Sequence, residues 1–116
     1  MRIAIVGSRE PKISYERFCE IVTKYTQRNK VDKIVSGGAA GIDTFARRYA
    51  EEKGIKLVEF LPDYEKDGRG APLVRNQKIV DASDVMFAFP CGESKGTHNS
   101  IEKAKKAGRI VKIFYE

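Results

Sequence analysis

Three short segments of small residues are the parts of the sequence best suited to bind a phosphate group. They are Gly7-Ser8-Arg9, the glycine-rich run from Gly37 to Gly41, and the stretch 92–97. Each precedes a segment with the apolar spacing of a helix. Helix amino termini offer unpaired N–H donors and a partial positive charge, and glycine lets an anion approach them closely. The three segments together predict a site for a phosphate-bearing ligand.

Five β-rich runs alternate with helical patterns and must position these segments. The runs are 2–6, 33–35, 55–61, 84–89 and 109–115, and the stretch 62–72 is expected to be a loop. Strands rich in Ile, Val and Phe that alternate with helices are typical of a parallel sheet covered on both faces. We therefore predict an α/β fold, a Rossmann-like doubly wound domain with a five-stranded parallel sheet in the order 3-2-1-4-5. In this topology the three segments meet at the carboxyl edge of the sheet.

Length and composition exclude several classes of protein. The chain has 116 residues, 41% of them hydrophobic and 33% charged, which fits one domain over residues 1–116. No apolar run approaches the roughly 20 residues of a membrane-spanning helix, and the amino terminus resembles a strand rather than a signal peptide. Two cysteines are too few for a disulfide framework or a metal site. We expect a cytoplasmic protein with no metal and no membrane partner.

The net charge of +6 permits a polyanionic partner without requiring one. The basic residues do not form a dense block, and several fall where helices are expected to end, where they complement the helix dipole. A solvated surface is therefore favoured over a nucleic-acid-binding face.

Three polar or aromatic side chains each have two roles open to them. Asp43, at the start of a helix, could cap that helix or bind a ribose hydroxyl. Arg75 could neutralise a phosphate or pair with Asp81 or Asp84. Tyr64, in the expected loop, could stack on a base or pack over the sheet.

With these motifs in place, the sequence resembles the SLOG superfamily, and most closely its YspA-like branch, which is related to the Smf/DprA proteins and to LOG-type phosphoribohydrolases. The matching segments are Gly7-Ser8-Arg9, the run from Gly37 to Asp43, Arg75-Asn76 and the stretch 89–97. The chain contains neither a Walker loop nor the dinucleotide fingerprint G-x-G-x-x-G. The resemblance implies a Rossmann-like domain that binds a nucleotide or a nucleotide-derived ligand. It also favours the phosphate role of Arg75, because Asn76 accompanies this arginine in the family pattern.

The chain departs from the LOG-type motif P-G-G-x-G-T-x-x-E at its catalytic position. Cys91 replaces the first glycine, the loop is longer by Glu93-Ser94-Lys95, and Ser100 stands where the glutamate is expected. Cleavage through an oxocarbenium-like state needs a nearby anion, and Glu102 is expected to face away from the site. These departures favour binding over hydrolysis, so an enzymatic function is not favoured.

Three functions stay open on the sequence. The first is binding or sensing of a nucleotide or nucleotide-derived small molecule, such as ADP-ribose, NAD or a mononucleotide, with no cofactor firmly implied. The second is a nucleotide-processing glycoside hydrolase or ribosyltransferase. The third, DprA-like binding of single-stranded DNA, ranks last because interleaved aromatic and basic residues are lacking. A homo-oligomer is left open.

The predicted ligand-binding residues are Gly7, Ser8, Arg9, Gly37, Gly38, Ala39, Gly41, Asp43, Arg75, Asn76, Gly92, Gly96 and Thr97.

Overall fold

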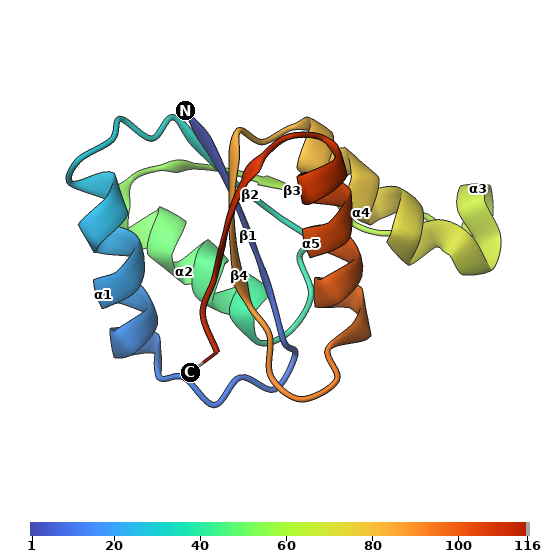
Figure 1. Ribbon diagram of the computed structural model, residues 1–116, viewed down its shortest axis with the longest axis horizontal. Helices are drawn as coiled ribbons and strands as arrows, with labels where there is room; N and C mark the ends of the chain where they lie inside the picture. Colours follow the sequence, from blue (N-terminus) through green and yellow to red (C-terminus); the bar gives the residue numbers. More distant parts are fainter. Residues whose placement is uncertain (116) are drawn as a thin grey trace.

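The computed structural model describes residues 1–115 and shows a five-stranded sheet between two layers of helices (Figure 1). Every neighbouring pair of strands is parallel, and the strand order is β3-β2-β1-β4-β5. The predicted doubly wound topology is confirmed. The elements are β1 (Arg2–Gly7), α1 (Tyr15–Thr26), β2 (Lys33–Ser36), α2 (Ile42–Lys53), β3 (Lys56–Glu59), α3 (Tyr64–Asp67), the 3-10 turn η1 (Gly68–Gly70), α4 (Ala71–Asp81), β4 (Val85–Phe89), α5 (Lys95–Lys106) and β5 (Ile110–Ile113).

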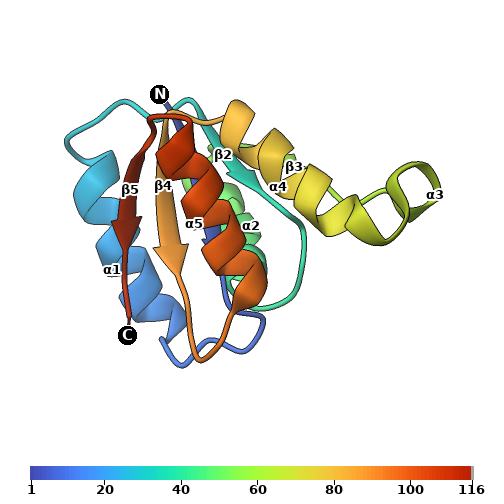
Figure 2. The ribbon, with the colours of Figure 1, turned by 45° about the vertical axis from the view of Figure 1, so that its right-hand side comes forward.

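Helices α1 and α2 cover one face of the sheet, and α4 and α5 cover the other (Figure 2). The first layer is rich in aromatic rings, and the ring centroid of Phe18 lies 5.2 Å from that of Phe89. The second layer packs aliphatic side chains such as Ile79 and Ile101 against β1 and β4. Burying one such side chain contributes about 1.5–3 kcal/mol, so both layers hold the strands in register.

Burial differs between the central and the edge strands. All of β4 and the middle of β1 are buried, as predicted for strands covered on both faces. In contrast, β3 and β5 are partly exposed, because an edge strand has a neighbour on one side only. Strand β3 also ends at Glu59, two residues before the predicted end.

The segment 62–72 is not a simple loop, which corrects the prediction. The side chain of Asp63 accepts a hydrogen bond from the N–H of Lys66 and starts the single turn of α3. Helix α4 then begins at Ala71, and Pro72 suits its first turn because the missing N–H is not needed there. The short α3 projects away from the sheet (Figures 1 and 2).

No helix within residues 1–115 is both long and apolar enough to cross a membrane.

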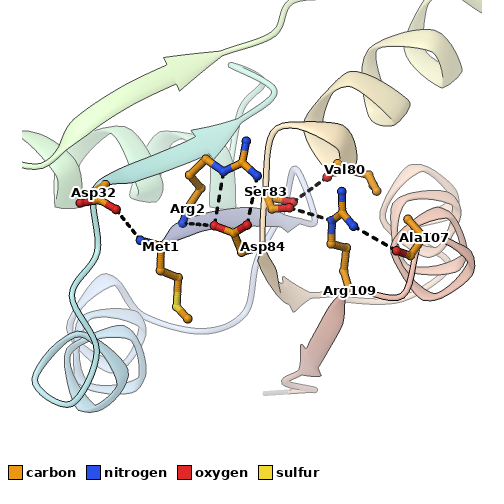
Figure 3. A network of polar contacts seen from close by, with 8 residues as sticks. All are labelled: Met1, Arg2, Asp32, Val80, Ser83, Asp84, Ala107 and Arg109. Carbon is orange, nitrogen blue, oxygen red and sulfur yellow. Dashed lines mark hydrogen bonds and ion pairs between the residues drawn. The ribbon is translucent and has the colours of Figure 1, made fainter.

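The amino-terminal ends of the strands are tied together by polar contacts (Figure 3). The guanidinium of Arg2 pairs with Asp84 at 3.0 Å, and these hydrogen bonds lower the pKa of Asp84 to about 2. The amino group of Met1 pairs with Asp32. Arg109 donates to the carbonyl oxygens of Ser83 and Ala107 at 2.7 and 3.0 Å. The charged groups at this edge are therefore engaged in holding β1, β4 and their neighbours together.

Candidate functional site

A hollow of about 420 Å³ lies at the carboxyl edge of the sheet, beyond the ends of β1, β2 and β4. Its volume falls within the range of about 300–1,000 Å³ that is usual for small-molecule sites. The hollow is formed by the segments following these three strands together with α4. Ten predicted residues line it: Gly7, Ser8, Arg9, Gly37, Ala39, Asp43, Arg75, Asn76, Gly96 and Thr97.

Three of the predicted glycines lie elsewhere. Gly38 lines a second hollow of about 310 Å³ beside the first. Gly41 packs against the segment after β1, because a Cβ placed on it would lie 2.3 Å from the carbonyl oxygen of Ser8. Gly92 lines neither hollow and has open space around it. Gly41 is therefore required for close backbone packing, and the prediction of direct ligand contact is not supported at Gly41 or Gly92.

The guanidinium of Arg75 is held in a fixed orientation within the site. Its Nη1 donates to the carbonyl oxygen of Gly37 at 2.8 Å and to that of Phe60 at 3.4 Å. Its Nε donates to Oδ1 of Asn76 at 3.0 Å. Within residues 1–115, Nη2 donates to no acceptor. The side chain therefore joins the segments after β2 and β3 and keeps two N–H donors for a ligand.

Asn76 is nearly buried and links Arg75 to α5. Its amide nitrogen donates to Oδ1 of Asn99 at 3.2 Å and to the carbonyl oxygen of Gly96 at 3.4 Å. The alternative pairing of Arg75 with Asp81 or Asp84 does not occur. Instead, Asp81 accepts from Gln77, and Asp84 pairs with Arg2. The Arg75-Asn76 pair thus connects three elements that surround the hollow.

Asp43 is 8% exposed and faces the hollow from the first turn of α2. Its carboxylate accepts a hydrogen bond from the N–H of Ala39 at 3.1 Å, so it orders the glycine-rich segment rather than capping α2. Burial raises the pKa of Asp43, although the hydrogen bond from Ala39 and the charge of Arg75 act in the opposite direction. The site therefore contains a carboxyl group that ionises less readily in the folded protein than in the unfolded chain.

Replacing Asp43 by asparagine is expected to raise the Tm at pH 7 by a few degrees. Because the pKa of Asp43 is raised in the folded state, its stabilising contribution is greatest at low pH and is lost as the pH rises through that value. The amide keeps an oxygen for the N–H of Ala39 and removes the cost of burying a charge. Thermal unfolding at pH 4 and pH 7 should show a larger gain at pH 7.

The exposed Asp63 provides a control for this prediction. Its replacement Asp63→Asn retains a capping side chain for α3 and should change the Tm little at either pH. If the gain in Tm of Asp43→Asn over wild type is smaller at pH 7 than at pH 4, the carboxylate stabilises the folded protein as an anion.

The amino terminus of α5 forms the wall of the hollow opposite Asp43. The helix begins at Lys95, after Ser94, which has a φ of +33°. The hydroxyl of Ser94 accepts from the N–H of Cys91 and donates to its carbonyl oxygen. This hydroxyl does not cap α5, and within residues 1–115 no side chain caps the helix, whose first residues, Lys95, Gly96 and Thr97, line the hollow.

Ser100 lines the same wall and is buried, whereas Glu102 is exposed and lines neither hollow. The position where a LOG-type glutamate was expected therefore carries a hydroxyl inside the hollow. The lining also includes Leu73 and Lys95, which the pattern of glycine segments does not predict. Lys95 could have been found from Ser94, a residue type that often precedes a helix.

The charges around the hollow are mixed but mainly positive. Arg9, Arg75 and Lys95 line it together with Glu10 and Asp43. Within residues 1–115, neither Arg9 nor Lys95 takes part in an ion pair. Arg9 and Arg75 also line the second hollow, so the two hollows adjoin. The arrangement can hold anionic groups at more than one position.

The sequence matches a known family over its amino-terminal part. Residues 1–66 fit the family described as "YspA, cpYpsA-related SLOG family", and this segment contains the first two phosphate-binding candidates. The chain belongs to this SLOG family. A curated relative of this SLOG protein, the Gene 61 protein of Mycobacterium phage D29, is 40% identical over 87 residues, which is 70% of each chain.

Two solved structures share the fold of this SLOG protein. DNA processing protein A from Helicobacter pylori, described for its unique single-stranded DNA binding mode, has a TM-score of 0.77 and 21% identity, covering 100% of this chain and 66% of that one. DprA from Streptococcus pneumoniae has a TM-score of 0.75 and 23% identity, covering 99% of this chain and 50% of that one. At these identities the likeness establishes the common fold. This SLOG protein thus spans less than two thirds of either DprA chain.

Proposed function

We propose that the protein binds single-stranded DNA at the carboxyl edge of its sheet. The observation that carries this proposal is the pair of adjoining hollows, which share Arg9 and Arg75 and continue to Lys95 at one end. An extended site with several cations suits the row of phosphates in a nucleic acid better than it suits one isolated phosphate group. The similarity to the Helicobacter pylori protein supports the same choice. DNA binding, which ranks last on the sequence alone, therefore becomes the leading function.

The free donors of the site explain how a phosphate would be held. The Nη2 of Arg75 supplies two N–H groups in a fixed direction, and the uncapped start of α5 supplies backbone N–H groups from the other side. Hydrogen bonds between charged donors and phosphate oxygens are short and roughly twice as strong as neutral ones. One nucleotide unit would place its phosphate between these donors, while Arg9 and Lys95 attract the flanking phosphates.

Fluorescence anisotropy with a labelled oligo(dT) tests the proposal. We expect binding that weakens with salt, with a slope of log K against log salt of about −2 if three cations each neutralise one phosphate. A duplex of the same length is the control and should bind more weakly. Absence of binding to oligo(dT) at low salt would rule out the proposed function.

Binding of a free nucleotide-derived ligand is the second candidate. The first hollow, at about 420 Å³, has the volume of a small-molecule site, and this observation keeps ADP-ribose, NAD and mononucleotides as predictions. Thermal shift with these compounds separates the two candidates. A large shift with one of them, in a protein that does not bind oligo(dT), would favour the small molecule. Chromatography of the same mixtures would reveal any cleavage, which the hydroxyl of Ser100 in place of a carboxylate does not favour.

A further inference from the structure

The exposed large apolar side chains are concentrated beside the site. Among residues 1–115, seven such side chains are exposed, and four of them fall within the short stretch 61–74, directly before Arg75. The most exposed of these four are Leu61, at 65%, and Tyr64, at 59%. Exposed apolar groups grouped around a polar hollow indicate contact with a ligand that has an apolar part.

Leu61 and Pro62 form the apolar side of the second hollow. The rest of its lining is the backbone-rich segment from Gly37 to Ala40, with Arg9 and Arg75 shared with the first hollow. Leu61 lies over this segment, because a Cβ placed on Gly38 would lie 2.7 Å from its Cδ2. A flat apolar group in the second hollow would therefore contact Leu61 on one side while its attached anion reaches Arg75.

Tyr64 extends this apolar side away from the sheet. It is the first residue of α3, two positions after Pro62, and the cap formed by Asp63 fixes the start of that turn. Its phenol interacts electrostatically with Arg75, although the pKa of Arg75 is lowered overall, mainly by burial. Tyr64 does not pack over the sheet, since its side chain is largely exposed. The ring lines neither hollow and is exposed two residues after Pro62, which lines the second hollow.

We propose that Leu61, Pro62 and Tyr64 form a stacking surface for a nucleobase whose phosphate occupies the first hollow. This inference rests on the proposed function. Nucleobases present flat apolar faces, and stacking on aromatic or apolar side chains tolerates any base sequence. The second hollow provides the space for the base, and the shared Arg75 sets its distance from the phosphate. Single-stranded DNA fits this arrangement, because a base in a duplex is already stacked between neighbours.

The test compares two oligonucleotides and matched variants. The probes are oligo(dT) and an abasic oligonucleotide of the same length, which retains sugars and phosphates but lacks bases. Tyr64→Ala is expected to weaken binding of oligo(dT) by about 5- to 100-fold while leaving the abasic probe unaffected. Tyr64→Phe should retain wild-type affinity because the ring is kept. Leu61→Ala should act in the same direction as Tyr64→Ala, with a smaller loss.

Tyr115→Ala and Ile110→Ala are the controls, since both side chains are exposed but lie in or just after β5, at the edge of the sheet opposite β3 and the stretch that follows it. Equal binding of oligo(dT) by wild type and by Tyr64→Ala and Leu61→Ala would overturn this inference and leave the proposed function intact. An equal loss on both probes would also overturn it. Failure of wild type to bind oligo(dT) would overturn the proposed function itself. Sedimentation of each variant completes the test, because a dimer that Tyr64→Ala dissociates would assign this surface to self-association instead.

Discussion

Replacing Arg75 by methionine is expected to weaken binding of oligo(dT) by about 10- to 100-fold. A hydrogen bond to a charged group contributes about 1.5–3 kcal/mol, and a tenfold change in affinity corresponds to about 1.4 kcal/mol. Arg75 is the cation whose other donors are bound to Gly37, Phe60 and Asn76, so its Nη2 is oriented before the ligand arrives. This orientation avoids an entropic cost on binding, and the side chain should therefore matter more than the exposed Arg9 or Lys95.

A lysine at position 75 should restore only part of the affinity. Lysine keeps the positive charge, but its ammonium cannot bond two backbone carbonyls and a phosphate in the planar arrangement of a guanidinium. We expect Arg75→Lys to fall between wild type and Arg75→Met. The measurement is anisotropy of labelled oligo(dT) at fixed salt, with circular dichroism to verify that each variant is folded.

Arg109→Met is the matched control for Arg75→Met. Like Arg75, Arg109 is half-buried and donates to two backbone carbonyl oxygens, but it lies at the opposite edge of the sheet (Figure 3). Both variants should lose some stability, and only Arg75→Met should lose affinity. Equal affinities of the two variants would show that Arg75 is a structural residue and does not contact the ligand.

Replacing Gly41 by alanine is expected to lower the free energy of unfolding by about 3 kcal/mol or more. Gly41 has a φ of +74° and a ψ of −124°, a conformation that is essentially restricted to glycine. A Cβ there would also lie 2.3 Å from the carbonyl oxygen of Ser8 and 2.5 Å from that of Arg9. The N–H of Ile42 donates to the same Ser8 oxygen at 3.1 Å, so the clash would break the contact between β1 and α2.

Gly54→Ala separates the steric cost from the conformational cost. Gly54 also has a positive φ, +66°, but a Cβ there would meet open space. We expect Gly54→Ala to lower the free energy of unfolding by about 1 kcal/mol. The Tm should fall by roughly 4 °C for Gly54→Ala and by more than about 10 °C for Gly41→Ala. Similar Tm values for both would indicate that the segment after β1 moves aside and that Gly41 serves only as a turn.

The strand order and the place of the site could both be predicted from local patterns. Apolar runs with helical segments between them specify parallel strands joined by right-handed crossovers, and the order follows when the first strand is central and the winding reverses after the third strand. Because the carboxyl ends of parallel strands share one edge, the segments after β1, β2 and β4 had to converge, and the hollow lies where they do. The YspA-like motifs pointed to the same edge and to the family that the match over residues 1–66 establishes.

Turn chemistry was predicted less well. The segment 62–72 appeared as a loop because its prolines, glycines and charges break any helical periodicity, yet it contains α3, η1 and the start of α4. Single turns are stabilised by one side-chain hydrogen bond, here from Lys66 to Asp63, and such a bond leaves almost no trace in apolar spacing. The exposed side chains of Leu61 and Tyr64 consequently could not be placed from sequence.

The sequence by itself determined the sheet, the edge that carries the site and the residue types that surround it, because these depend on periodicity, handedness and backbone freedom within short segments. Only the tertiary structure decided which atoms are free to bind. It places Gly41 against Ser8, engages Asp43 with Ala39, and leaves the Nη2 of Arg75 without an acceptor among residues 1–115. These outcomes depend on how side chains from elements distant in sequence fill the space between them, and residue spacing along the chain carries no information about that packing.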